Sequence, residues 1–232
     1  MKIGNRMRQV LLVTCTLCAS GGAFAGNLGL AAKASTLGYG LEADYALSEK
    51  LSLRGQFNTL NYDDNFDKDG VNYTGSLDLS TLGFLVDWHP MGGAFRVTGG
   101  LYSNGNSISG VGTGEGTYTI GDQTYTVGKD DTLRATADVD LGSSIAPYFG
   151  IGWGHAPSNK GGLLLSFDIG VLYQGSPDAT LAVTGTANNG TVDFTNDPTL
   201  QAEVRNEEQN LEDDLSSFKT YPVVSLGIGW RF

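Results

Sequence analysis

The chain contains eight segments in which apolar and polar residues alternate, which is the side-chain period of a β-strand. The alternation is clearest in the last twelve residues, 221–232. One face of this segment is apolar and ends in two aromatics: Val224, Leu226, Ile228, Trp230 and Phe232. The other face is small or polar and carries Arg231. A strand with lipid on one side and a polar lumen on the other has this pattern, which predicts the closing strand of a transmembrane β-barrel.

Seven earlier segments alternate in the same way: 28–35, 39–47, 51–62, 74–89, 94–103, 144–154 and 162–173. Most of them have the 9–11 residues that a tilted transmembrane strand needs. Every second connection is short (48–50, 90–93, 156–161), whereas three others are long and polar (63–73, 104–140, 174–219). Short periplasmic turns and longer extracellular loops give this asymmetry. We therefore predict an all-β fold: an eight-stranded antiparallel transmembrane β-barrel with both termini in the periplasm.

Three stretches do not fit a simple barrel strand. Leu77 and Leu79 are out of phase with the apolar positions after residue 81, so we expect a bulge near 80–81 or an extension of this strand above the membrane. Residues 118–127 predict a small hairpin around Gly121 and Asp122, outside the membrane. In the acidic stretch 199–218, apolar residues recur at helical spacing, which predicts an amphipathic helix.

The amino-terminal segment has the features of a secretory signal peptide. Lys2, Arg6 and Arg8 precede an apolar run at 10–17, and 23–25 reads Ala-Phe-Ala. Residues 1–25 are therefore predicted to be removed, leaving 26–232 as the outer-membrane barrel domain. Both cysteines, Cys15 and Cys18, lie in the removed segment, so we expect no disulfide in the mature chain.

Charge and hydropathy exclude two classes of protein. The predicted signal peptide holds three of the 14 basic residues and none of the 25 acidic ones, so 11 basic residues face 25 acidic ones and the mature net charge is −14. Nucleic-acid binding needs basic patches, and we expect none here. No run of 18 apolar residues follows the signal, which argues against a helical membrane protein. The 34 glycines, with frequent Tyr and Phe, suit a small barrel.

The inward faces of the predicted strands carry four basic and four acidic side chains. The set is Lys33, Glu42, Asp44, Arg54, Asp87, Arg96, Asp168 and Arg231. One interpretation is a salt-bridged plug, in which each buried ion is offset by a partner. The other is a narrow, charge-lined path for a small zwitterion or cation. An eight-stranded barrel is just wide enough for its own side chains, so both interpretations stay open.

Signals for catalysis, metals and cofactors are weak. His89 and His155 lie near the predicted periplasmic turns, and we interpret them as interfacial residues rather than catalytic ones. Asp87 shares a face with His89, but no serine is clearly placed beside this pair, so we expect no enzyme. Residues 65–70 imitate a calcium loop, yet Ser76 stands where such a loop needs a glutamate, and we expect no metal site. No cofactor motif occurs.

Several blocks of the chain resemble the CarO-like outer-membrane proteins. They are Ser-Ile-Ala-Pro-Tyr-Phe-Gly-Ile-Gly-Trp at 144–153, the strand 166–173 with Gln-Gly-Ser-Pro at 174–177, Gly-Tyr-Gly at 38–40, the acidic run before the last strand, and Tyr-Pro-Val at 221–223. The resemblance implies eight antiparallel strands. The family is known from work on carbapenem susceptibility, and uptake of basic amino acids such as ornithine has been proposed for it, so the resemblance also implies a role in transport. The ending with Trp230 and Phe232 is similar to the terminal signature of outer-membrane barrels, which implies recognition by the barrel-assembly machinery.

These observations lead to two hypotheses of function. The first is a narrow porin-like channel for small polar or cationic solutes, such as basic amino acids, whose anionic loops raise the local cation concentration. The alternative is a non-conducting structural or interaction barrel with a salt-bridge-plugged lumen, whose long loops contact partners or lipopolysaccharide. Both place a monomer in the bacterial outer membrane, surrounded by lipid.

Overall fold

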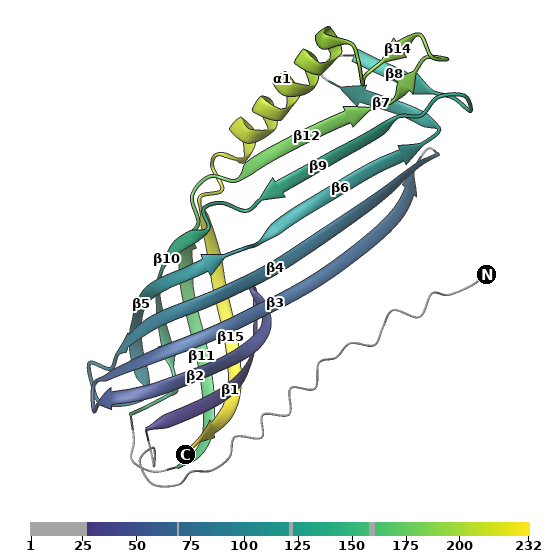
Figure 1. Cartoon of the computed structure of the whole chain (residues 1–232). Coiled ribbons are helices and arrows are strands. Elements are labelled where there is room, and N and C mark those ends of the chain that lie inside the picture. Colours follow the sequence, from purple (N-terminus) through teal and green to yellow (C-terminus); the bar gives the residue numbers. More distant parts are fainter. Residues whose placement is uncertain (1–26, 69, 121–122, 158–160) are drawn as a thin grey trace, which may run out of the picture.

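The protein is a barrel continued at one end by a sheet that leaves it, as the computed structural model in Figure 1 shows. The structure describes residues 27–68, 70–120, 123–157 and 161–232. The predicted signal peptide, 1–25, lies outside the described residues. No helix in these ranges is both long and apolar enough to cross a membrane.

Eight antiparallel strands form a closed ring, which confirms the predicted fold class. In ring order they are β5 (Phe95–Asn104), β4 (Val71–Trp88), β3 (Leu51–Lys68), β2 (Gly38–Ser48), β1 (Leu28–Ser35), β15 (Thr220–Arg231), β11 (Gly162–Tyr173) and β10 (Ile145–Trp153). The last strand, β15, pairs with both β1 and β11, and β10 pairs with β5 to complete the ring. The connections 49–50 and 89–94, and residues 154–157 after β10, lie at one end, called the turn end here, together with the carboxyl terminus.

The outer wall of the ring is apolar because the strands alternate as predicted. On β10 and β15, exposed apolar side chains alternate with small or buried ones. The three tryptophans, Trp88, Trp153 and Trp230, all lie near the turn end and are exposed. Tyr39 and Tyr173 are exposed near the opposite end. Aromatic side chains concentrate at the two interfaces of a membrane, so this wall has the pattern of a lipid-facing belt.

The structure corrects the acidic loop expected at 63–73. Strands β3 and β4 instead continue beyond the ring as one long hairpin, with pairs from Leu51↔Trp88 to Lys68↔Val71 and no shift of register. The change of phase near residue 80 is therefore not a bulge, and the alternative expectation of an extended strand was right. The calcium-like segment begins within β3 rather than in a turn, and no group of His, Cys, Asp or Glu in the described ranges is arranged to hold a metal ion.

Strand β4 changes partner where it leaves the ring. Its residues 81–88 pair with β5, and its residues 71–78 pair with β6 (Ser107–Gly114). Two asparagine side chains stabilise the point at which β4 changes partner. The backbone N–H of Ser80 donates to Oδ1 of Asn106 at 2.9 Å, and Nδ2 of Asn104 donates to the carbonyl of Leu141 at 2.8 Å. These bonds satisfy backbone groups at a point where the sheet ladder divides.

The part beyond the ring, called the extension here, consists of the upper halves of β3 and β4 and the elements that follow them. These are β6, the hairpin β7 (Gly116–Ile120) and β8 (Gln123–Val127), β9 (Arg134–Asp140), β12 (Asp178–Thr184), β13 (Thr186–Ala187), β14 (Val192–Asp193) and α1 (Pro198–Leu215). The predicted hairpin and helix are confirmed, although Gly121 and Asp122 lie outside the described residues. Strands β6, β9 and β12 were not predicted, because their sequences are short and rich in Gly, Ser, Thr and Ala.

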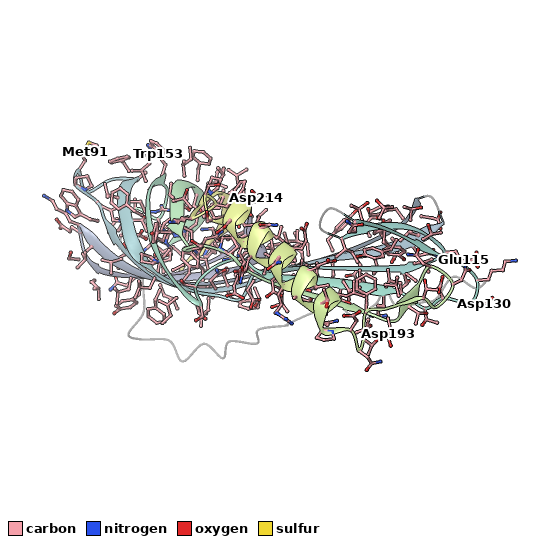
Figure 2. All side chains as sticks on the ribbon, turned by 90° about the horizontal axis from the view of Figure 1, so that it is seen from above. Met91, Glu115, Asp130, Trp153, Asp193 and Asp214 are labelled. Atoms are coloured by element: carbon pink, nitrogen blue, oxygen red, sulfur yellow. The ribbon has the colours of Figure 1, made fainter. Side chains whose placement is uncertain are left out.

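Helix α1 begins at a favourable cap and covers an apolar core. Oδ1 of Asp197 accepts the N–H of Thr199 at 2.8 Å, and Pro198 occupies the first turn. Figure 2 shows the helix running along the extension, with Asp214 toward the barrel and Asp193 toward the tip. The core beneath it contains Val71, Tyr118, Ile120, Tyr125, Val127, Leu133, Val183, Ala187, Phe194 and Val204.

Candidate functional site in the barrel lumen

The eight charged residues selected from the sequence all lie buried in the lumen, and the structure brings them together. Lys33 comes from β1, Glu42 and Asp44 from β2, Arg54 from β3, Asp87 from β4, Arg96 from β5, Asp168 from β11 and Arg231 from β15. They point inward because charged and apolar positions alternate along each strand. The phase of each strand therefore identifies the members of this cluster, and closure of the ring brings them into contact.

Asp168 and Arg54 form the centre of the network. Carboxylate oxygens of Asp168 lie 3.2 Å from Lys33 Nζ, 3.2 Å from Arg54 Nη1 and 2.7 Å from Arg96 Nη2. The guanidinium of Arg54 also contacts Glu42 at 3.1 Å and Asp87 at 2.9 Å. Each ion thus has more than one partner of opposite charge, which offsets the cost of removing it from water.

A second group of ions lies closer to the turn end, and it includes a histidine. Asp44 contacts Arg231 Nη2 at 2.5 Å and His155 Nδ1 at 2.7 Å, while His155 Nε2 lies 2.9 Å from Glu42. A carboxylate only accepts hydrogen bonds, so Nδ1 carries a proton and donates to Asp44, and the negative charge of Glu42 beside Nε2 favours the cationic imidazole. Burial lowers the pKa of His155, but the hydrogen bonds with Asp44 and Glu42 outweigh it and raise the pKa above its ordinary value.

The interpretation of His155 as an interfacial residue was therefore wrong. Its side chain is 1% exposed, and its backbone has a φ of 52°, a left-handed conformation just after β10 ends. This turn directs the ring back into the lumen. With His155 the network contains five cations and four carboxylates rather than a neutral set. Strand alternation could not find this residue, because it lies outside the strands.

His89 is also buried rather than interfacial, and a serine does lie beside it. Ser52 Oγ is 3.1 Å from His89 Nε2, and His89 Nδ1 is 2.9 Å from the carbonyl oxygen of Gly93. A carbonyl only accepts, so Nδ1 carries the proton and Nε2 accepts from the hydroxyl of Ser52. The Gly93 carbonyl, rather than Asp87, therefore orients the ring. Both residues are 0% exposed, so this hydrogen-bonded pair lies enclosed within the barrel and joins β3 to the turn after β4.

An apolar layer closes the lumen on the extension side of the charges. It consists of Leu37, Leu85, Tyr102, Ala146, Tyr148, Leu172 and Val223. The rings of Tyr102 and Tyr148 meet edge to face, with centroids 5.5 Å apart. Between this layer and the charges remains a cavity of about 10 Å³, lined in part by Arg54 and Asp168. That volume holds about one water molecule. The described side chains thus close the lumen at two successive levels.

Glycines make this filling possible in so narrow a ring. A Cβ at Gly152 would lie 2.5 Å from Oδ1 of Asp168, and one at Gly29 would overlap the carboxylate of Asp44. Because these two strand positions lack a side chain, the carboxylates of the neighbouring strands occupy the space. The inward glycines of the sequence are therefore part of how the lumen is filled.

No family model matches the chain, and no curated protein matches it either. Solved structures with a similar fold include two from Acinetobacter baumannii. The crystal structure of Acinetobacter baumannii CarO2 is 18% identical, with a TM-score of 0.56 over 89% of this chain and 98% of that chain. The crystal structure of Acinetobacter baumannii CarO is 19% identical, with a TM-score of 0.55 over 91% of this chain and all of that one. At this identity the likeness concerns the fold, and at that level it confirms the CarO-like resemblance.

Proposed function

We propose that the protein is a closed outer-membrane β-barrel that anchors the extension at the cell surface. The observation that carries the proposal is the lumen, which is filled at one level by paired ions and at the next by apolar side chains. The lipid-facing wall and the CarO-like fold support the location in the outer membrane. Under this proposal the extension, rather than the lumen of the barrel, carries the function of the protein.

The energetics of the ion network favour a closed barrel. A solute passing the level of Arg54 would have to separate its guanidinium from Glu42, Asp87 and Asp168. Leaving one member of a buried ion pair without its partner costs about 3–5 kcal/mol, and here several contacts would break together. A barrel of eight strands has no free interior through which the solute could pass around them.

The positions of the short and long connections support an extension that faces the cell exterior. Short connections lie at the turn end, and the long connections are all used to build the extension. In outer-membrane barrels the short turns are periplasmic and the longer loops extracellular. Under this proposal the carboxyl terminus, with Trp230 and Phe232, lies on the periplasmic side, where the barrel-assembly machinery would recognise it. Lipopolysaccharide would then surround the base of the extension.

Uptake of small cationic solutes, such as basic amino acids, is the second candidate. The observation that favours it is the acidity of the extension, where Asp63, Asp64 and Asp67 are exposed on the upper half of β3. Negative surface charge raises the local concentration of cations. A cationic or zwitterionic solute could also replace partners within the network. Uptake would require both closing levels to open in turn.

Single-channel recording in planar bilayers distinguishes the two candidates. We expect no resolved openings from the refolded mature protein, and none from Arg96→Ala, because the apolar layer remains. Arg205→Ala on the exposed face of α1 is the matched control. Cation-selective openings in the wild type, altered by Arg96→Ala but not by Arg205→Ala, would overturn the closed barrel. Swelling of liposomes in ornithine or lysine would then test uptake directly.

A further inference from the structure

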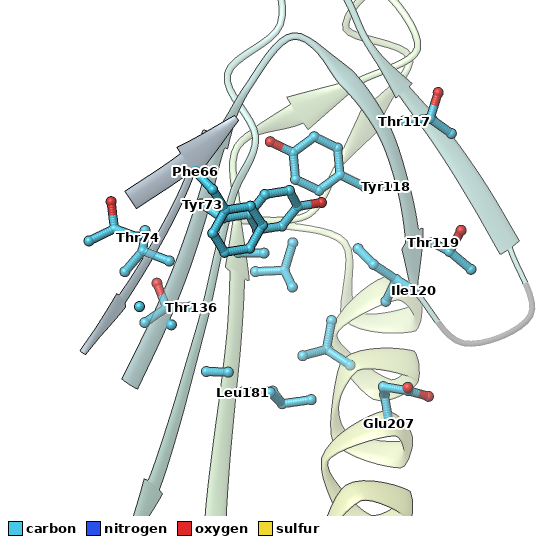
Figure 3. Close-up of a pocket in the computed structure, with 18 residues that line it drawn as sticks. Phe66, Tyr73, Thr74, Thr117, Tyr118, Thr119, Ile120, Thr136, Leu181 and Glu207 are labelled. Atoms are coloured by element: carbon cyan, nitrogen blue, oxygen red, sulfur yellow. The ribbon is translucent and has the colours of Figure 1, made fainter. Parts of the chain in front are cut away.

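The extension contains a hollow whose lining no part of the proposed function uses. It has a volume of about 580 Å³ and lies between the sheet, the β7–β8 hairpin and α1 (Figure 3). One wall is the pair Phe66 and Tyr73, whose rings stack with centroids 5.1 Å apart. Tyr118 and Ile120 of β7 form another part of the lining. Pockets for small molecules usually measure about 300–1,000 Å³, so this one has a suitable size.

The hollow exists because the sheet carries very small residues at its floor. Gly75 pairs with Gly110, and Gly110 pairs with Ala137, so three adjacent strands present almost no side chain in one row. A Cβ placed on Gly75 or Gly110 would meet no atom within 4 Å. These glycines are therefore not required by close packing against a neighbour. Protein interiors are normally filled, and here the space is left open.

The lining is mostly apolar and aromatic, with four threonines and one charged side chain. That side chain is Glu207 of α1, and no Lys, Arg or His lines the hollow. The two neighbouring glutamates are already engaged, since Glu203 accepts the hydroxyl of Tyr125 at 3.1 Å and Glu208 accepts the N–H of Leu181 at 2.7 Å. The carboxylate of Glu207 has no hydrogen bond or ion pair with any residue that the structure describes. Its carboxylate is available to a ligand.

We infer that this hollow binds a small amphipathic cation, with an apolar or aromatic body between Tyr73 and Tyr118 and an amine at Glu207. Aromatic faces attract cations, and the carboxylate supplies the opposite charge. An anion of the same shape would find no basic partner in the lining, and the net negative charge of the mature chain, with 25 acidic and 11 basic residues, would repel it. The inference is independent of whether the barrel conducts.

Three probes with the same apolar body test the charge selection. They are 4-phenylbutylamine, 4-phenylbutanol and 4-phenylbutanoate, titrated by calorimetry against the full mature protein in nanodiscs, with empty nanodiscs subtracted. We expect the amine to bind most tightly, the alcohol more weakly and the carboxylate least. Equal binding of amine and carboxylate, or no binding of the amine above empty nanodiscs, would overturn the inference. Tighter binding of the carboxylate would point instead to an anionic lipid and would also overturn it.

Two substitutions locate the site. Gly110→Phe fills the open floor and should abolish binding of amine and alcohol alike, whereas Gly99→Phe, at a strand glycine in the ring whose Cβ also meets nothing, should leave it unchanged. Glu207→Gln keeps the shape and should weaken only the amine, about three- to fivefold, as expected for a partly exposed ion pair. Glu212→Gln on the same helix is its control. Amine affinity that survives both Gly110→Phe and Glu207→Gln would place the cation elsewhere and contradict the inference.

Discussion

The barrel and the extension are built on the same strands, yet they bury opposite chemistry. In the ring, the inward face of β4 carries Thr81 and Asp87, and Asp87 joins the ion network. In the extension, the same face of β4 carries Val71 and Tyr73, which pack in or against the apolar core. No shift of register separates the two halves. The change therefore follows the surroundings of the strand, because lipid accepts apolar side chains outside the ring while water does not accept them around the extension.

The opposite face of β4 shows the same contrast. Phe84 is 71% exposed in the ring, where it would face lipid, while Asn72 is exposed in the extension, where it would face water. An exposed side chain is therefore expected to be apolar in the ring and polar in the extension. The phase change that the sequence displays near residue 80 marks the point at which β4 leaves the ring.

Removing a carboxylate from the centre of the network is expected to have the largest effect. Asp168→Asn leaves Lys33, Arg54 and Arg96 without their shared anion. Each of these cations keeps another carboxylate, Glu42 or Asp87, but the buried network loses the anion that they share. Removing one partner of a buried ion pair costs about 3–5 kcal/mol, so we expect the free energy of unfolding to fall by about 3 kcal/mol, the lower end of that range. Urea titration of the barrel in lipid vesicles measures it. Asp213→Asn, on the exposed face of α1, should change almost nothing; equal effects would contradict a tightly paired lumen.

An arginine introduced on the outward face of β4 should have different effects on stability in the ring and in the extension. Phe84→Arg puts an arginine on the lipid face and should destabilise the barrel by about 2–4 kcal/mol, depending on depth. Asn72→Arg puts it on the corresponding face of the extension and should stay within about 0.5 kcal/mol. Both variants are compared in vesicles by urea unfolding. A large loss at both positions would show that the sidedness of β4 does not change.

Weakening the apolar core should loosen the extension alone. Phe194 is fully buried, and its ring meets Tyr125 edge to face with centroids 4.8 Å apart. Phe194→Leu removes this contact and leaves a small void, at an expected cost of about 1–2 kcal/mol. Hydrogen exchange should become faster in β8, β12 and α1, with the ring strands unchanged. Faster exchange throughout the ring would mean that the two regions unfold as one unit.

The smallest expected effect is a dependence on pH that arises in the barrel. The pKa of His155 is raised in the folded protein, so its stabilising contribution is complete below the unfolded pKa of about 6.5 and is lost as the pH rises through the folded value. His155→Gln should remove this dependence. The difference in unfolding free energy between wild type and variant should therefore shrink as the pH is raised. A difference that grows with pH would show that the imidazole of His155 is neutral in the folded protein.

The sequence predicts the barrel well because alternation against lipid is a strong, local pattern. It identified eight strands and the eight charges of the lumen, since each of these side chains follows from the phase of its own strand. It missed β6, β9 and β12, which are short and polar and depend on pairing with the upper half of β4. It also misplaced His155, because a left-handed turn rather than strand phase directs that ring inward. Pairing partners and turns are tertiary information that no single segment contains.

Access of a small thiol reagent to the lumen is the most direct test of the closed barrel. The chain has cysteines only at 15 and 18, within the predicted signal peptide, so single cysteines can be introduced into the mature protein. Ser52→Cys and Ser225→Cys lie in the wall of the lumen, and Ser216→Cys is exposed after α1. We expect a methanethiosulfonate reagent to modify Ser216→Cys at once and the two lumenal cysteines only after unfolding. Rapid modification of both lumenal cysteines in the folded protein would show a continuous water path and contradict the closed barrel.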